Sequence, residues 1–376
     1  MKHLFAVITV LILSACGGGG GGGGGGGPEG SLSAVASTET CATPQYLSVD
    51  DHRSAILDLR YDDPGVNAQG QLVNSVDAVK LFVDRIRCVG FSTVILQTNT
   101  PIDPATGMLQ LSRPLPSDFW RIVDYAKSKG LKVGIVALPV DHVTDNTILS
   151  INTPKEFFDS LATYKKQLAQ MAETHRVDVF YVGAWQQDLD TDQYSADWDH
   201  VISEIRSVYK GKLTYLACPT CDNVVWGKVD YISMSYDPNR ISADLIRNIS
   251  NKYNKKINID AIKISTSSVT DAGDFIWNAL MSGDFNTITN AVNTADYPLQ
   301  ATRITAVFAL GSTVRQHING YAFSEYMPWS QATWIQNAQP GQAGYTWKLF
   351  DTLGFSLYNN IPAQTTLKKL LSQPFN

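Results

Sequence analysis

The sequence lacks the short motifs of several common enzyme classes. It has no Gly-x-Ser-x-Gly elbow, and beyond the glycine run of residues 17–27 it has no phosphate-binding loop and no Gly-x-Gly-x-x-Gly run. Its six histidines show no paired spacing that would make His142 a zinc ligand. We therefore expect no metal centre and no cofactor.

An excess of basic charge and a membrane-spanning stretch are also missing. The chain carries 30 basic and 35 acidic residues, for a formal net charge of −5, and the two signs are interspersed. Nucleic acid is therefore not an expected partner. The longest apolar run covers residues 4–13, well short of the roughly 20 residues that a spanning helix needs.

The start of the chain instead predicts export and lipid attachment. Lys2 and His3 precede the apolar run, a layout typical of a secretory signal peptide over residues 1–15. The sequence from Leu13 to Cys16, Leu-Ser-Ala-Cys, resembles a bacterial lipobox, which implies cleavage before Cys16 and lipidation there. Gly17 in place of an aspartate favours the outer membrane, on its periplasmic face or at the cell surface. Ordinary cleavage near Ala15, leaving a free thiol, is the alternative.

A glycine-rich segment separates this signal from the rest of the chain. Eleven glycines at 17–27 and a small, polar stretch up to about residue 45 predict a disordered tether over residues 16–45. Such a tether spans on the order of 30 Å. The folded domain is expected at 46–376, anchored to the membrane through Cys16.

Four cysteines besides Cys16 suit an exported protein with two disulfides. One pairing joins Cys41 to Cys88 at the first helix and Cys218 to Cys221, but the spacing leaves the pairing open. Cys-Pro-Thr-Cys at 218–221 has the spacing of thioredoxin-like motifs. The helix start that this redox chemistry requires is missing, which favours a local structural disulfide.

Eight short apolar runs alternate with helical patterns, which is typical of a parallel sheet. The runs cover residues 55–61, 92–99, 132–140, 177–185, 213–218, 230–237, 256–263 and 319–327. Helical periodicity covers 75–88, 117–130, 153–175, 196–209, 243–253 and 299–317, with Gly130 placed as a C-cap and only a short turn near 224–227. Because eight strands close a barrel, we predict a single (β/α)8 TIM barrel; an open doubly wound sheet is the alternative.

Candidate functional residues follow from the C-terminal strand ends, where such barrels carry their sites. The candidate carboxylates are Asp188, Asp260 and Glu325. The candidate substrate-binding residues are Asp58, Arg60, Gln97, Asn99, Asp141, His142, Trp185, Gln186, Tyr236, Asp237 and Trp329. Carboxylates, amides and aromatic rings together are typical of a sugar site. A buried ion pair is the alternative role for Asp58 and Arg60.

The aspartates in the segment after the fourth apolar run are spaced as in a calcium-binding loop. Asp188, Asp190, Asp192 and Asp199 lie at suitable intervals, but Gln193 stands where the sharp turn of such a loop needs glycine. A solvated loop is therefore favoured over a calcium site.

Several segments carry a resemblance to a known family. They cover residues 90–94, 126–133, 177–183, 198–206, 209–215 and 229–236. In order and spacing they resemble the barrel glycosidases of glycoside hydrolase family 113, which cleave β-mannans. The resemblance implies retaining hydrolysis, with a glutamate acid/base ending strand four and a glutamate nucleophile ending strand seven. Here Trp185 or Gln186 takes the first place, and residues 259–265 contain no glutamate.

Three hypotheses follow for function. Asp188 with Asp260 or Glu325 replaces the lost pair, and the protein is a glycosidase with altered chemistry. Alternatively, the barrel holds a polysaccharide or oligosaccharide through Trp185, Tyr236 and Trp329 without cutting it. In the third, the chain is a surface scaffold or adhesin with no glycan ligand.

Overall fold

The computed structural model describes the part of the chain that forms the barrel. It covers residues 52–59, 76–102, 108–109, 115, 117–141, 153–186, 189–221, 223–264, 284, 286–287, 290, 296–326 and 361–373. All of these lie in one compact unit, Thr40–Asn376. The expected signal, the lipidated Cys16 and the glycine-rich segment lie outside the described residues.

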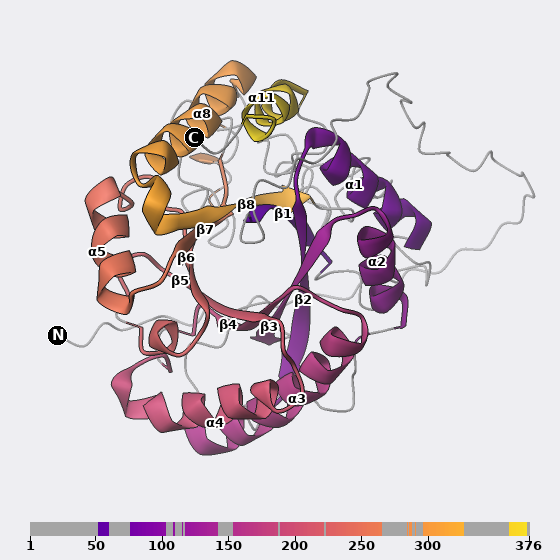
Figure 1. Cartoon of the computed structure of the whole chain (residues 1–376), viewed down its shortest axis with the longest axis vertical. Helices are drawn as coiled ribbons and strands as arrows, with labels where there is room; N and C mark the ends of the chain where they lie inside the picture. The colour runs from indigo at the N-terminus through magenta and orange to yellow at the C-terminus, as the bar shows by residue number, and fades with distance from the viewer. Residues whose placement is uncertain are drawn as a thin grey trace, which may run out of the picture. The chain divides into compact units, whose positions relative to one another are not determined.

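Eight parallel strands pair in sequence order, and the last closes on the first. The strands are β1 (His52–Asp58), β2 (Thr93–Ile102), β3 (Lys132–Asp141), β4 (Val179–Ala184), β5 (Lys212–Ala217), β6 (Tyr231–Ser235), β7 (Ile257–Ile262) and β8 (Ile318–Tyr326). Figure 1 shows this ring viewed along the barrel, with helices around it. The predicted (β/α)8 barrel is confirmed, and the open doubly wound sheet is wrong.

Helices connect the strands on the outside of the ring (Figure 1). They are α1 (Val76–Val89), α2 (Ser117–Ser128), α3 (Pro154–Thr174), α4 (Ser195–Arg206), α5 (Ala243–Tyr253), α8 (Tyr297–Thr313) and α11 (Ile361–Leu371), with short 3₁₀ turns η1 (Asp192–Tyr194), η2 (Val225–Gly227) and η3 (Arg315–His317). As expected, the described residues between β5 and β6 contain only the short turn η2. The helix α11, which packs against α8 and α1, was not predicted. None of the described helices is long and apolar enough to cross a membrane.

Strand alternation divides the core into two layers. In β4, Phe180 and Val182 face the helices and join a large outer cluster that includes Trp198 of α4. Val179 and Tyr181 face the opposite way, into the barrel. The interior cluster consists of Ile56, Ile95, Val136, Leu138, Val179, Tyr181, Ala184, Leu216, Tyr231, Ala261 and Ala322. The interior is therefore filled with side chains, and room for a ligand exists only at its ends.

Irregularities in β4 and β7 interrupt this alternation near the C-terminal ends of these two strands. The β4–β5 register shifts between Tyr181 and Gly183, and the β7–β8 register shifts between Ile259 and Ile262. Bulges of this kind redirect the side chains that follow them and are common beside functional sites. They determine which residues of β4 and β7 reach the barrel mouth.

Candidate functional site

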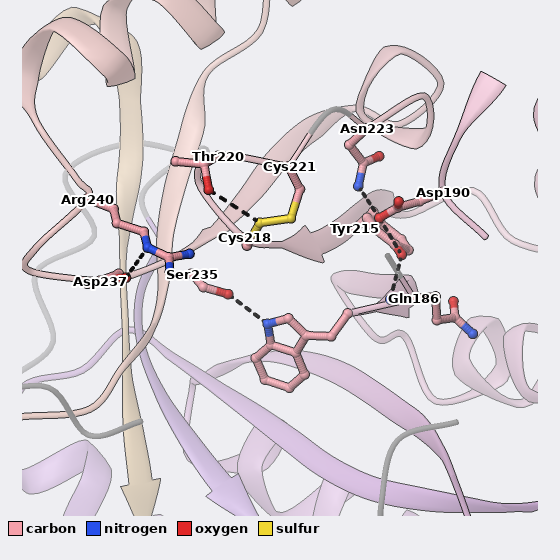
Figure 2. Close-up of a disulfide and its surroundings, with 11 residues drawn as sticks. Gln186, Asp190, Tyr215, Cys218, Thr220, Cys221, Asn223, Ser235, Asp237 and Arg240 are labelled. Carbon is pink, nitrogen blue, oxygen red and sulfur yellow. Dashed lines mark hydrogen bonds and ion pairs between the residues drawn. A yellow bond between two sulfur atoms is a disulfide. The ribbon is translucent and has the colours of Figure 1, made fainter. Parts of the chain in front are cut away.

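A pocket of about 190 Å³ lies at the C-terminal ends of the strands. Its lining comes from the end of β4, the loops after β5 and β6, and the end of β7. The lining residues are Trp185, Cys218, Pro219, Ser235, Tyr236, Asp237, Arg240, Ala261 and Lys263. Three of the sequence candidates, Trp185, Tyr236 and Asp237, thus meet in one place. Figure 2 shows Cys218, Ser235, Asp237 and Arg240 of this pocket.

Trp185 is held from two directions. Its backbone N–H donates to the carbonyl of Leu216 on β5 at 2.9 Å, and its indole Nε1 donates to Ser235 Oγ on β6 at 2.8 Å. The side chain is half-buried. The ring is therefore presented at the pocket in a defined orientation, and its one polar atom is already satisfied.

Backbone strain is concentrated at this pocket. Four described residues other than glycine have positive φ: Arg176, Trp185, Asn254 and Ala261. Arg176 and Asn254 follow the ends of α3 and α5, where left-handed residues are common. Trp185 (φ 52°) and Ala261 (φ 49°) line the pocket, and no helix end accounts for them. Such outliers persist only where the surrounding structure enforces them, which points to a functional role for the pocket.

A buried hydrogen-bond network supports the segment that follows Trp185. Asp190 is fully buried, and its Oδ2 accepts from Tyr215 O–H at 3.2 Å and from Asn223 Nδ2 at 2.8 Å (Figure 2). The Tyr215 hydroxyl also accepts from Gln186 N–H at 3.1 Å. Burial, with the nearby Asp190 charge, raises the pKa of Tyr215 well above its usual value, so it remains a donor. Sequence reasoning missed this network because its members are far apart along the chain.

Gln186 does not line the pocket. Its side chain is buried on the helix-facing side, where a Cβ placed on Gly183 would lie 2.5 Å from its Oε1 and 2.8 Å from Tyr215. Glycine at position 183 therefore leaves the space that Gln186 and Tyr215 occupy. The bulge in β4 explains the placement, because it turns Gln186 away from the mouth that Trp185 faces.

Asp260 lies in the barrel interior and has no solvent exposure. Its Oδ2 accepts from Tyr181 O–H at 2.6 Å, and its Oδ1 accepts from the Ala261 N–H at 2.7 Å. Burial raises the pKa of Asp260 above its usual range, although these hydrogen bonds oppose the shift. Asp260 therefore belongs to the packed interior beneath the pocket.

Asp237 lines the pocket with both carboxylate oxygens in use. Oδ1 accepts from the Asn239 N–H at 2.9 Å, and Oδ2 lies 3.1 Å from Arg240 Nε (Figure 2). Arg240 was not among the sequence candidates. The three-residue spacing of Asp237 and Arg240 was the available signal for this ion pair.

The remaining candidates fall into two groups. Asp58 and Gln97 pair in register on β1 and β2 and are buried. Asn99, Asp141 and Glu325 lie in β2, β3 and β8, with side chains outside the described set. Arg60, His142, Asp188 and Trp329 lie outside the described residues altogether.

The local disulfide is confirmed: Cys218 and Cys221 are bonded beside the pocket (Figure 2). Cys88 is disulfide-bonded as well, while its expected partner Cys41 lies outside the described residues. In the part of the chain that the structure describes, no group of three or more His, Cys, Asp or Glu side chains is placed to hold a metal. Two carboxylates of the calcium-like spacing point to different partners: Asp190 contacts Tyr215 and Asn223, whereas Asp199 pairs with Lys228 at 2.6 Å.

Comparison with known proteins places the barrel near one family of glycosidases. A model of Glycoside Hydrolase Family 113 matches residues 112–273, from before α2 to beyond β7. A solved complex of a GH113 β-1,4-mannanase aligns with TM-score 0.59 and 18% identity, over 79% of this chain and 92% of that one. The chain is a GH113-like barrel. No curated protein matches it in sequence.

Two further GH113 structures agree with this assignment. A GH113 β-1,4-mannanase aligns with TM-score 0.60 and 17% identity, over 86% of this chain and all (100%) of that one. The GH113 β-mannanase of Alicyclobacillus acidocaldarius in complex with ManMIm aligns with TM-score 0.58 and 14% identity, over 87% and 99%. At these identities the alignments support the GH113-like fold alone.

Proposed function

We propose that this protein is an exported, lipid-anchored barrel that binds a polysaccharide or oligosaccharide at the mouth of the barrel without hydrolysing it. Cys16 and the signal before it support the anchor, and the GH113-like barrel supports a glycan as ligand. The single observation that carries the proposal is the braced Trp185 at the end of β4. There the family resemblance places a catalytic acid.

Trp185 suits binding and not proton transfer. An indole N–H is a hydrogen-bond donor only, and here it is engaged by Ser235 at 2.8 Å. Trp185 and Tyr236 line the same small pocket. Stacking of aromatic faces on a sugar ring uses this kind of surface.

The described carboxylates do not form a hydrolytic pair. Retaining hydrolysis needs two carboxyl groups about 5–5.5 Å apart, one to protonate the leaving group and one to attack. Of the described residues that line the pocket, Asp237 is the one carboxylate, and both its oxygens are engaged. Asp260 is fully buried and held by Tyr181. These placements favour a binding cleft.

Binding is tested by calorimetry and tryptophan fluorescence with the Cys16→Ser chain, expressed without residues 1–15 to avoid detergent. The ligands are oligosaccharides of β-1,4-mannan, cellulose and mixed-linkage β-glucan. We expect Trp185→Ala to weaken binding at least about tenfold. Tyr297→Ala, which removes an exposed aromatic side chain on α8, is the matched control and should bind like wild type. Absence of binding to every glycan would remove the proposal.

Hydrolysis is tested separately by the release of new reducing ends from the same polysaccharides. We expect no release from wild type. If wild type releases them and Asp188→Asn or Glu325→Gln abolishes the release, those carboxylates form a shifted catalytic pair and the protein is a glycosidase.

A further inference from the structure

The described pocket carries more positive than negative charge. Arg240 follows β6 and Lys263 follows β7, and both line it together with one carboxylate, Asp237. This balance contrasts with the whole chain, whose formal net charge is −5.

Asp237 acts as the support of Arg240. Its carboxylate accepts from Asn239 N–H and pairs with Arg240 Nε, while its main-chain carbonyl accepts from Arg240 N–H at 3.0 Å and from Ile241 N–H at 2.8 Å. The turn leads directly into α5, whose N-cap, Ser242, accepts from Leu245 N–H at 3.2 Å. Arg240 is thus held both at its backbone N–H and at the Nε of its guanidinium.

The outer end of Arg240 remains available. A guanidinium has five N–H groups, and the ion pair with Asp237 uses the one on Nε. Within the described residues, the terminal amino groups of Arg240 have no protein partner, and the side chain is 59% exposed. Paired terminal N–H groups match the geometry of a carboxylate, to which they donate two parallel hydrogen bonds.

The apolar part of the pocket supplies the other half of the recognition surface. Trp185, Tyr236 and Pro219 line it beside the two cations. At about 190 Å³ the pocket is smaller than the roughly 300–1,000 Å³ of pockets that take drug-sized ligands. It suits a single sugar ring, stacked on the aromatic faces, with a charged substituent directed at Arg240.

We propose that the glycan bound in this pocket is acidic, and that the carboxylate of a uronic acid residue pairs with the terminal amino groups of Arg240 and with Lys263. This inference rests on the proposed function, because it names the chemical class of the ligand for that same pocket. It assigns specificity to two residues for which the family resemblance implies no role.

The test compares ligands that differ only in charge. Oligomers of β-1,4-linked mannuronate and their carboxyl-reduced counterparts, which are β-1,4-mannan oligomers, are titrated into the Cys16→Ser chain. A sulfated β-1,4-mannan oligomer is a third ligand. We expect the uronate oligomer to bind about tenfold or more tightly than the reduced one. Its affinity should fall as sodium chloride rises from about 20 to about 500 mM.

Variants locate the charge preference. Arg240→Gln should bring the affinity for the uronate oligomer close to that for its reduced form, and Lys263→Gln should narrow the difference. Arg247→Gln is the matched control, because Arg247 on α5 makes the same kind of i,i+3 ion pair, with Asp244, and does not line the pocket. Arg247→Gln should keep the full preference for the uronate oligomer over its reduced form.

The outcomes separate the two proposals. Equal affinity for charged and reduced oligomers overturns the acidic ligand and leaves glycan binding in place. Binding of no oligomer at all overturns the proposed function. A preference that survives both Arg240→Gln and Lys263→Gln overturns the assignment of these residues. Tighter binding of the sulfated than of the uronate oligomer overturns the carboxylate in favour of a sulfate ester.

Discussion

At the scale of single residues, the barrel interior buries an acid that a sequence pattern would place at the mouth. Asp260 has the residue type and approximate position expected of a catalytic carboxylate. In the structure, however, the Asp260 side chain accepts a hydrogen bond from Tyr181 inside the barrel. The backbone becomes left-handed only at the next residue, Ala261. A one-residue change in direction on a strand therefore decides between a reacting group and a structural one.

The pH dependence of stability reports on Asp260. Burial raises its pKa above 3.8, so the folded state holds a proton that the unfolded chain releases as pH rises. The contribution of Asp260 to stability is thus present below about pH 3.8 and is lost as pH rises through the folded pKa. We expect the unfolding free energy of wild type, minus that of Asp260→Asn, to fall from about pH 4 to about pH 7 in urea denaturation. Asp192→Asn, at an exposed site, should show no such trend; a flat difference for Asp260→Asn as well would contradict the prediction.

Lys165 on α3 is the opposite case, a fully buried cation between two strands. Its ammonium donates to the carbonyls of Ala137 on β3 at 3.0 Å and Tyr181 on β4 at 3.3 Å. The registered pairs of β3 with β4 are confined to Gly134–Val179 and Ile135–Phe180. Lys165 therefore bridges the two strands beyond the end of their ladder.

Burial lowers the pKa of Lys165 to about 7. Above that pH the folded state releases a proton that the unfolded chain keeps up to about pH 10.5, so stability rises with pH in this window. Relative to Lys165→Met, wild type should gain up to ~1.4 kcal/mol per pH unit between about pH 7 and pH 10. Lys166→Met, at a partly exposed lysine paired with Glu204, is the control. If the unfolding free energies of wild type and Lys165→Met change with pH in parallel, the lowered pKa of Lys165 is disproved.

At the scale of elements, closure of the ring depends on a close approach of β8 to β1. A Cβ placed on Gly320 would lie 2.4 Å from the main-chain oxygen of His52. That atom belongs to the backbone and cannot rotate away, so a side chain at 320 would separate the paired strands.

We therefore expect Gly320→Ala to reduce the free energy of unfolding by about 3 kcal/mol. Gly227→Ala is the matched control, because the nearest atom to its added Cβ is 3.9 Å away, and its change should stay within about 0.5 kcal/mol. Urea titration measures both. Equal stabilities of the two variants would show that β1 and β8 adjust more readily than the geometry indicates.

At the scale of the whole molecule, we propose that the anchor and the pocket together hold a glycan beside a membrane. The anchor is tested by labelling with palmitate in a Gram-negative host. Cys16→Ser should lose the label and move from the membrane fraction to the soluble fraction. The double variant Cys218→Ser/Cys221→Ser removes the disulfide at the pocket and should stay labelled. A labelled Cys16→Ser chain would overturn the assignment of the lipid to Cys16 and place it on another residue.

Much of the fold was predictable from local patterns. Alternating apolar runs and helical periods predicted all eight strands, most of the helices and the turn near η2, and Gly130 takes the positive φ (79°) expected of a residue after a helix. The helix α11 was missed, although a (β/α)8 barrel places a helix after each strand and α11 follows the eighth. These elements are readable because burial of one face imposes a period on the sequence nearby.

The pocket was only partly predictable. The expectation that functional residues lie at the C-terminal strand ends placed Trp185, Tyr236 and Asp237 together. It could not show that Gln186 faces the helices or that Asp260 lies inside the barrel. Arg240 was missed because it lies in the turn after β6 and not at the end of a strand.

The sequence alone thus predicts the number and order of the eight strands and, by its motifs, the lipid anchor. Which side chains face the pocket is settled in three dimensions, by bulges in β4 and β7 and by the left-handed backbone at Trp185 and Ala261. The physical reason is that periodicity is a local property of the chain. Side-chain direction at a bulge depends instead on pairing with neighbouring strands and on hydrogen bonds donated to distant residues such as Ser235 and Tyr215.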